Sequence, residues 1–293
     1  MQPAFSSPGW GQPEEKAAQK LVSLGLEEDF GERGDVTSAN FVDAKELGTI
    51  RIVCRQRGVL SGMPIAPLVI QQIDERIQCE QILEDGSPLE PGSVIAILQG
   101  PARSMLMAER TILNFLTHLS GIASRTREFV EAVAGTSAAI LDTRKTLPGY
   151  RRLQKYAVRC GGGQNHRMGL YDAVMLKDNH LAAITDRDPA DVVQELKQKY
   201  DQIPVIVEVD RLDQLSQVFQ WKPDVVLLDN MPPEVMRAAV ELRNQSAPQV
   251  QLEASGGVNL ETVSAIAATG VDRISIGSLT HSSPACDIGF DWS

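Results

Sequence analysis

Apolar runs of strand length alternate with stretches of helical spacing through the second half of the chain. Near-continuous runs of Val, Ile, Leu and Ala are typical of strands buried on both faces, and their alternation with helices favours a parallel sheet. The predicted helices cover 189–200 and 233–244, and the pattern as a whole predicts an α/β barrel. The predicted strands are 138–142, 172–176, 204–209, 224–228, 250–254 and 272–277.

The first half of the chain has a different pattern. Helical spacing over 14–26 is followed by a predicted loop at 31–38. Short β-like runs separated by Gly, Pro and Asp-Gly turn signals then predict a small sheet over 48–100. The stretch 104–134 has a long helical period, in which we expect a break near Gly121 to mark the domain boundary.

The composition of the chain argues against several classes of function. The formal net charge is -10, which argues against a nucleic-acid surface, and an aromatic content of 5% is too low for base-stacking platforms. The N-terminus has no signal-peptide pattern, and apolar runs stay shorter than a membrane span. Four scattered cysteines without a CxxC pair support neither a zinc site nor a disulfide framework, so we expect a reducing, cytoplasmic location.

Positive charge is concentrated between Asp142 and Lys177, where eight Lys and Arg residues face only two Asp residues. A solvated surface normally mixes the two signs. Guanidinium and ammonium groups gathered in one place suit carboxylates and phosphates. We therefore expect a site for a small polyanion, in preference to the alternative of an ordinary charged surface.

Polar residues end each predicted strand, and in a parallel barrel these ends meet at one rim. Ser255-Gly256-Gly257 and Gly277-Ser278 suggest a backbone phosphate nest, with ordinary turns as the alternative. Glu208 and Asp229 could hold Mg²⁺ or face developing positive charge, or else pair with a nearby Arg or Lys. The residues suited to a planar carboxylate, and so to a ligand with two carboxylates or with a carboxylate and a phosphate, are Arg144, His166, Arg167 and Lys177.

The segments DTRKTLPGYRRLQKYAVRCGGGQNHRMGLYDAVMLKDNH, VEVD, LLDN, LEASGGVN and ISIGSLTHS together closely resemble the quinolinate phosphoribosyltransferase family, a type II phosphoribosyltransferase family. The likeness covers about 21–291 and includes GDVTS, GVLSG and AERTILNFLTHLSGIAS. It implies an α/β fold with an N-terminal α/β sandwich-like domain at 13–120. It further implies an incomplete α/β barrel of parallel strands at 121–280 and a C-terminal tail at 281–293 that returns to the first domain.

The family resemblance also implies the activity and the partners. Phosphoribosyl pyrophosphate (PRPP) and quinolinate would give nicotinate mononucleotide, pyrophosphate and CO2 in NAD biosynthesis, with Mg²⁺ and no organic cofactor. The site would be shared between the subunits of a homodimer. Carried over onto this chain, Arg110 from the neighbouring subunit would bind quinolinate together with Thr143, Arg144, His166, Arg167 and Lys177.

The PRPP side follows from the same resemblance. Lys145, Glu208 and Asp229 would be catalytic residues that serve PRPP, with Glu208 and Asp229 at the Mg²⁺. The residues that would hold the 5-phosphate are Ser255, Gly256, Gly257, Ile276, Gly277 and Ser278. Two other readings stay open: a ModD-like paralogous phosphoribosyltransferase acting on another anion, and a non-catalytic phosphate-binding barrel that senses a metabolite.

Overall fold

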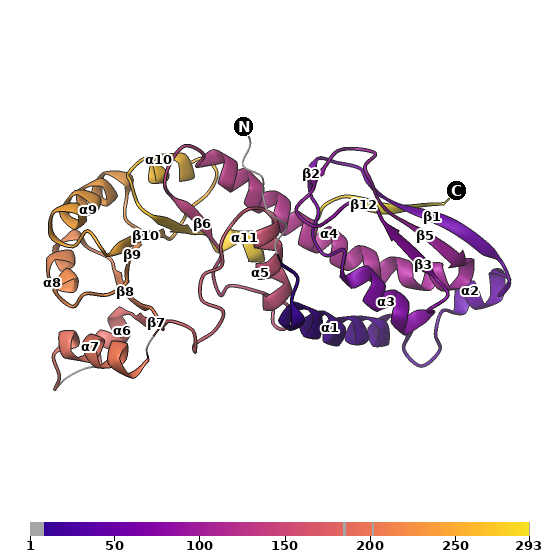
Figure 1. Ribbon diagram of the computed structural model, residues 1–293, viewed down its shortest axis with the longest axis horizontal. Helices are drawn as coiled ribbons and strands as arrows, with labels where there is room; N and C mark the ends of the chain where they lie inside the picture. The colour runs from indigo at the N-terminus through magenta and orange to yellow at the C-terminus, as the bar shows by residue number, and fades with distance from the viewer. Residues whose placement is uncertain (1–8, 184–185, 201, 293) are drawn as a thin grey trace. The chain divides into compact units, whose positions relative to one another are not determined.

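A computed structural model describes residues 9–183, 186–200 and 202–292 of the chain (Figure 1). The chain forms two compact units, and it passes between them repeatedly. The first unit takes the described residues up to Arg127, then Thr146–Gly162, and the chain from Ser278 onward. The second unit takes Glu128–Lys145 and Gly163–Gly277.

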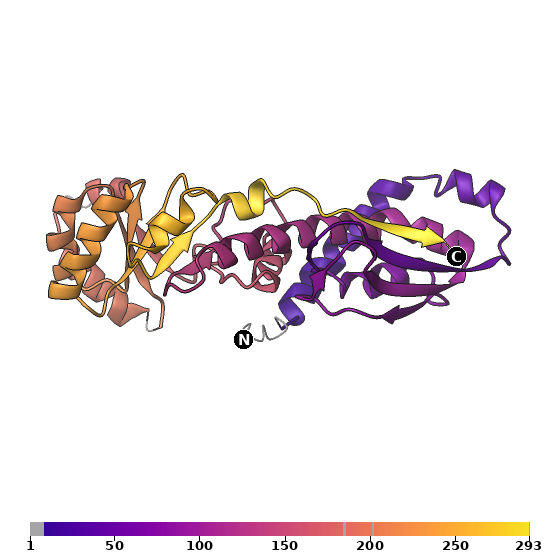
Figure 2. The ribbon, with the colours of Figure 1, turned by 90° about the horizontal axis from the view of Figure 1, so that it is seen from above.

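The first unit is built on an antiparallel sheet with the strand order β12-β1-β5-β3. The C-terminal strand β12, yellow in Figure 2, pairs with β1 although the two lie at opposite ends of the sequence. Helices α1 and α3 contact one another within this unit. Its strands are β1 (Leu47–Cys54), β2 (Gly58–Val59), β3 (Gln78–Gln81), β4 (Pro88–Leu89), β5 (Val94–Pro101) and β12 (Ile288–Trp292). Its helices are α1 (Gln12–Phe30), α2 (Val36–Phe41), α3 (Ile65–Ile73), α5 (Arg151–Cys160) and α11 (Ser278–His281).

The predicted helix break near Gly121 is wrong. Helix α4 runs without interruption over Ala102–Ala132, and the boundary between the two units falls within it, after Arg127. Gly121 is buried, and a Cβ at this position would overlap the carbonyl oxygen of Pro284. The glycine thus permits a close approach between helix and chain, a use of glycine that local sequence does not separate from a helix break.

The predicted loop at 31–38 is correct only in its first part. Helix α2 begins at Val36, because the Asp35 carboxylate accepts hydrogen bonds from the main-chain N–H groups of Thr37 and Ser38, both at 2.9 Å. This is the usual way in which Asp caps a helix N-terminus. The capping hydrogen bonds also lower the pKa of Asp35, with the bonds from Ser38 first among the causes.

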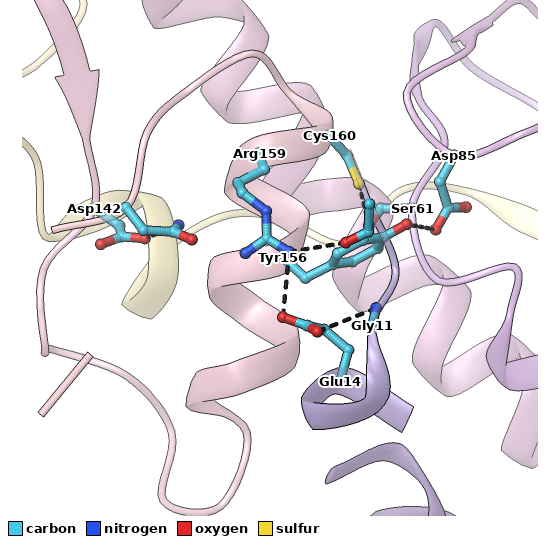
Figure 3. A network of polar contacts seen from close by, with 10 residues as sticks. Gly11, Glu14, Ser61, Asp85, Asp142, Tyr156, Arg159 and Cys160 are labelled. Carbon is cyan, nitrogen blue, oxygen red and sulfur yellow. Dashed lines mark hydrogen bonds and ion pairs between the residues drawn. The ribbon is translucent and has the colours of Figure 1, made fainter. Parts of the chain in front are cut away.

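A buried polar network joins α5 to the rest of the first unit (Figure 3). The hydroxyl of Tyr156 donates to Asp85 at 2.8 Å, and Asp85 also accepts the main-chain N–H groups of Gly62 and Met63. Ser61 donates to the thiol of Cys160 at 3.2 Å. Burial raises the pKa of Asp85. A buried carboxyl group that lost its donors would destabilise the unit, so the hydrogen bonds from Tyr156, Gly62 and Met63 are needed for its burial.

The second unit is built on a six-stranded parallel sheet with the order β6-β11-β10-β9-β8-β7. All six predicted strands and both predicted helices are confirmed. Because β6 and β7 are edge strands, the sheet is an open, incomplete barrel, as expected. Helices α8 and α9 lie along one side of the strands in Figure 1. The strands are β6 (Ala139–Leu141), β7 (Val174–Leu176), β8 (Val205–Val209), β9 (Val225–Asp229), β10 (Gln251–Ser255) and β11 (Arg273–Ser275). The helices are α6 (Asp178–Ala182), α7 (Pro189–Lys199), the 3₁₀ helix η1 (Leu212–Gln214), α8 (Leu215–Gln220), α9 (Pro233–Ser246) and α10 (Val263–Ala267).

The four cysteines are free thiols. The Sγ atoms of Cys54 and Cys286 lie 3.9 Å apart in the first unit, well beyond the length of a disulfide bond. None of the helices within the described ranges has both the length and the apolar character needed to cross a membrane.

Candidate active site

The register of the parallel sheet brings the predicted strand-end residues of the second unit together. Leu176 pairs with Val207, so Lys177 and Glu208 are neighbours just beyond this pair. On the other side of β8, Ser255 of β10 pairs directly with Asp229 of β9. Carboxyl ends of parallel strands share one edge. The sheet therefore places these side chains along a single rim.

The same register decides which face of the sheet they occupy. Glu208 lies opposite Leu227, and Leu227 lies opposite Glu253. Because side chains alternate between faces with a period of two, Asp229 and Ser255 lie on the same face as this row, one step nearer the carboxyl edge. Apolar side chains of this face pack together below the rim, and they include Val225, Leu227, Ile206 and the partly buried Met175.

Two arginines of this site form no ion pair with an acid among the described residues. Arg144 follows β6, and one guanidinium nitrogen, Nη1, is buried with no hydrogen-bond partner in that part of the chain. Arg167 donates from Nη1 to the carbonyl of Ala173 at 3.2 Å and from Nη2 to the sulfur of Met175 at 3.4 Å. Burial lowers the pKa of Arg167, and the positive charge of Arg144 lowers it further, against a smaller opposing effect of Asp172. Such a pair of cations is stabilised by an anionic ligand.

Lys177 and Glu208 form the closest ion pair at the rim. The ammonium nitrogen of Lys177 lies 2.6 Å from Oε2 of Glu208. The sequence left two roles open for Glu208, ligand contact or pairing with a nearby cation, and this contact is the pairing. The main-chain N–H of Lys177 also donates to Nδ1 of His180 at 3.1 Å, which fixes the turn that follows β7.

The turn after β10 has a backbone that only glycine adopts easily. Gly256 and Gly257 have φ angles of +93° and +62°. A Cβ at Gly256 would overlap the side-chain amide of Asn230, which itself has a φ of +53° and donates its main-chain N–H to the carbonyl of Ser255 at 2.8 Å. The sequence did not point to Asn230 as a packing partner, although Asn is the residue other than glycine that most often adopts this conformation.

His166 contacts other residues through its main chain and through both ring nitrogens. Its main-chain N–H donates to Asp142 at 2.9 Å, and its Nδ1 accepts the main-chain N–H of Arg167 at 2.6 Å. Its Nε2 lies 3.1 Å from Oε1 of Glu253. Sequence reasoning missed Glu253, although an acid within the apolar run of β10 was a signal of a buried charged contact.

The remaining predicted residues divide between the units. Thr143 accepts the main-chain N–H of Lys145 at 3.1 Å, and the Lys145 side chain is exposed. The main-chain N–H of Ile276 donates to Leu141 at 2.9 Å, which fixes the turn leading to Gly277. Arg110, exposed on α4, and Ser278, at the start of α11, belong to the first unit. That unit also holds four cations of the predicted basic window, all on α5: Arg151, Arg152, Lys155 and Arg159.

Two carboxylates lie at the rim where a divalent cation could bind: Glu208, which is paired with Lys177, and Asp229. The described residues contain no cluster of three or more His, Cys, Asp and Glu side chains suited to a metal ion. Mg²⁺ prefers six oxygen ligands and usually keeps waters and phosphate oxygens among them. The site therefore fits a Mg²⁺ ion that arrives with a phosphorylated ligand better than a permanently bound one.

Two family models match the chain, one on each side of residue 121. The model described as "Quinolinate phosphoribosyl transferase, N-terminal domain" matches residues 35–120. The model described as "Quinolinate phosphoribosyl transferase, C-terminal domain" matches residues 122–291. A nicotinate-nucleotide pyrophosphorylase [carboxylating] of Mycobacterium leprae is 43% identical over 94% of this chain and 97% of its own length. A probable enzyme of the same name from Bacillus subtilis is 39% identical over 93% of this chain and 92% of its own.

Solved structures agree with these sequence matches. The nicotinate-nucleotide pyrophosphorylase of Francisella tularensis is similar with a TM-score of 0.89 and 38% identity, over 95% of this chain and 96% of that one. The corresponding protein of Ehrlichia chaffeensis has a TM-score of 0.86 and 37% identity, over 94% and 98% of the two chains.

Proposed function

The chain belongs to the quinolinate phosphoribosyltransferase family, and from this premise we propose that it transfers the phosphoribosyl group of PRPP to quinolinate. The transfer is coupled to decarboxylation and gives nicotinate mononucleotide, pyrophosphate and CO2. The protein is accordingly a pentosyltransferase of NAD biosynthesis.

The observation that carries this proposal is the pair Arg144 and Arg167. Quinolinate has two carboxylates on adjacent ring carbons, and neither guanidinium group forms an ion pair with a described residue that would outcompete it. Guanidinium binds carboxylate through two parallel hydrogen bonds, so Arg144 Nη1 gains the acceptor it lacks. Lys177 supplies a third, more mobile cation, and Thr143 and His166 complete this side of the proposed site.

PRPP is proposed to occupy the rim on the side of β9, β10 and β11. Gly256 and Gly257 are exposed in the turn after Ser255, and with Ile276, Gly277 and Ser278 the main-chain N–H groups of this turn would cradle the 5-phosphate. The exposed ammonium of Lys145 would reach the pyrophosphate group. Glu208 and Asp229 would face the ribose, where positive charge develops in the transition state.

Mg²⁺ is proposed to enter with PRPP, held by Glu208 and Asp229, directly or through water. When bound, it would neutralise negative charge on the pyrophosphate oxygens. Oε2 of Glu208 is paired with the ammonium group of Lys177, so a Mg²⁺ ion would compete with Lys177 for this oxygen.

The bond changes follow from these positions. The pyridine nitrogen of quinolinate attacks the anomeric carbon of the ribose, and the electron pair of the breaking C–O bond leaves with pyrophosphate. The ring is then a pyridinium. The C–C bond to the adjacent carboxylate breaks next, its electron pair stays on the ring carbon next to the positive nitrogen, and CO2 departs. That carbon takes a proton from solvent. No organic cofactor is needed for these steps.

Turnover of quinolinate tests the proposal. The purified protein is incubated with PRPP, Mg²⁺ and quinolinate, and nicotinate is the parallel substrate. We expect nicotinate mononucleotide and CO2 in equal amounts from quinolinate and no product from nicotinate. Tight quinolinate binding without turnover would favour a metabolite sensor, and neither binding nor turnover would favour a ModD-like paralogue with another acceptor.

The assembly is proposed to be a homodimer in which Arg110 of one subunit completes the site of the other. Arg110 is exposed on α4 and available for such a contact. Mixing Arg110→Ala subunits with Lys145→Ala subunits tests it, since one of the two sites in a mixed dimer would hold both original residues. Activity should return to a fraction of the wild-type value. Mixtures as inactive as the separate variants would contradict the shared site.

A cytoplasmic location is part of the same proposal. Free thiols at all four cysteines suit a reducing compartment.

A further inference from the structure

Glu253 is an acid in the interior of the second unit. It lies in the middle of β10, directly opposite Arg273 of β11, and its exposed fraction is 0%. Its Oε2 lies 3.0 Å from Nε of Arg273, and its Oε1 lies 3.1 Å from Nε2 of His166, although none of these four buried atoms meets hydrogen-bond geometry with a partner among the described residues. A buried acid destabilises a protein unless cations or donors surround it, so these two neighbours explain how Glu253 is tolerated.

Glu253 is ionised. Burial alone would raise its pKa, but the contacts with His166 and Arg273 outweigh burial and hold the pKa below the ordinary value for glutamate. A carboxylate has acceptors only. Its two oxygens therefore call for a donor from each neighbour.

The hydrogen bond between the main-chain N–H of Arg167 and Nδ1 of His166 indicates which ring nitrogen of His166 carries the proton. Nδ1 accepts the main-chain N–H of Arg167 and so carries no proton. The ring proton is then on Nε2, the nitrogen that lies 3.1 Å from Oε1 of Glu253. Each nitrogen of the imidazole has one role, and exchanging the roles would break both contacts.

We propose that Glu253 is a positioning residue for the dicarboxylate site: it fixes the Nε2–H tautomer of His166, and His166 fixes the main chain that carries the Arg167 guanidinium. Because the Arg167 side chain is also anchored, at Ala173 and Met175, a small shift of its main chain misdirects the guanidinium. The inference rests on the proposed function, in which Arg167 binds a carboxylate of quinolinate.

Glu253→Gln is the informative substitution, because it keeps the shape of the side chain and replaces one acceptor with a donor. The single amide oxygen should turn to Arg273, the charged donor, which leaves the amide NH2 facing His166. Nε2 must then become the acceptor, and the proton moves to Nδ1, where it opposes the N–H of Arg167.

A second substitution should reverse this effect. Arg273→Met removes the competing donor, so in the double variant the amide oxygen at position 253 is free to turn towards His166 and accept the proton of Nε2. We expect Glu253→Gln to weaken quinolinate binding about tenfold or more, as displaced binding groups do, with the KM for PRPP unchanged. The double variant should recover most of the loss.

The experiment combines quinolinate titration calorimetry and steady-state kinetics with ¹⁵N NMR of the imidazole nitrogens, the His166 signals being assigned through a His166→Gln sample. Support would be a proton on Nε2 in the wild type, its transfer to Nδ1 in Glu253→Gln, and recovery of both tautomer and affinity in the double variant. Wild-type quinolinate affinity in Glu253→Gln, or a double variant weaker than the single one, would overturn the inference. A wild-type protein that binds no quinolinate would overturn the proposed function. The tautomer signals would still test, without any substrate, whether Glu253 controls the proton of His166.

Discussion

Nζ of Lys177 and Oε2 of Glu208 lie 2.6 Å apart, which joins a residue proposed for quinolinate to a residue proposed for PRPP. The contact follows from the register of β7 and β8. Either substrate must therefore compete with the ion pair. By linkage, a substrate that takes one partner frees the other for the second substrate, so the two substrates should bind with positive coupling.

Removing the charge of Glu208 should have opposite effects on the two substrates. In Glu208→Gln, Lys177 loses its internal competitor, and we expect quinolinate to bind severalfold more tightly. An exposed or half-exposed ion pair is worth roughly 1 kcal/mol or less, which limits the gain to about fivefold. Use of PRPP should fall by about 100-fold or more, as when a group that stabilises transition-state charge is lost. Titration calorimetry and PRPP-dependent kinetics measure the two quantities, and weaker quinolinate binding would contradict the competition.

Arginine and lysine variants should separate the two halves of the site. Arg144→Ala and Arg167→Ala each remove charge-assisted hydrogen bonds worth about 1.5–3 kcal/mol, so the dissociation constant of quinolinate should rise about 10- to 100-fold. Lys145→Ala and Asp229→Ala should instead damage the use of PRPP and leave quinolinate binding within about threefold. Four variants with equal and small effects on both substrates would show that these assignments are wrong.

Adjacent glycines provide a matched pair of variants at the proposed phosphate turn. Gly256→Ala forces Asn230 to move and strains a φ of +93°, whereas a Cβ at Gly257 meets open space. We expect the first substitution to raise the KM for PRPP about tenfold or more and the second to cost only about 1 kcal/mol of backbone strain. Comparable KM values for PRPP in the two variants would contradict the proposal that the turn after β10 binds the phosphate.

His118 makes the stability of the first unit depend on pH. Its Nε2 lies 3.0 Å from Nε2 of Gln154, which donates to the carbonyl of Thr280 at 3.0 Å and is therefore an amide N–H group. A protonated His118 would oppose donor to donor, and burial lowers its pKa below the ordinary value of 6.5. The unfolded chain thus takes up the proton first, so the stabilising contribution is present above about pH 6.5 and is lost as the pH falls below it.

Urea unfolding at about pH 7.5 and about pH 5.5 measures this effect, with His118→Asn as the control. The Asn side chain keeps an acceptor for Gln154 and does not titrate. The wild type should lose more unfolding free energy between the two pH values than the variant does. Equal losses would mean that His118 plays no part in the pH dependence.

The sequence predicted the sheet of the second unit because its strands are buried on both faces and their apolar runs end in polar residues. Every predicted strand forms there, and Lys177, Glu208, Asp229 and Ser255 follow from the rule that parallel strands share a carboxyl edge. The spacing of apolar residues reports which positions of a single element are buried. The strands and the polar residues at their ends can therefore be recognised from the local sequence.

Contacts between distant residues were beyond the reach of the sequence pattern. Gly121 looks like a helix break until the carbonyl of Pro284 is placed against it. The proposed role of Glu253 depends on its contacts with His166 and Arg273, which lie far from it in the sequence and are brought next to it by the fold. The resemblance to a known family supplied the expected roles of the site residues, but not the Lys177–Glu208 ion pair or the tautomer of His166.

The most direct test of the central claim follows the carbon atoms of quinolinate. Quinolinate with ¹³C in the carboxylate next to the nitrogen, or in the other carboxylate, is supplied to the purified protein with Mg²⁺, with and without PRPP. The proposed reaction releases ¹³CO2 only from the carboxylate next to the nitrogen and only when PRPP is present, and the other label stays in nicotinate mononucleotide. Release of label without PRPP, or formation of a nucleotide that keeps both labels, would contradict a transfer in which the phosphoribosyl pyridinium drives decarboxylation.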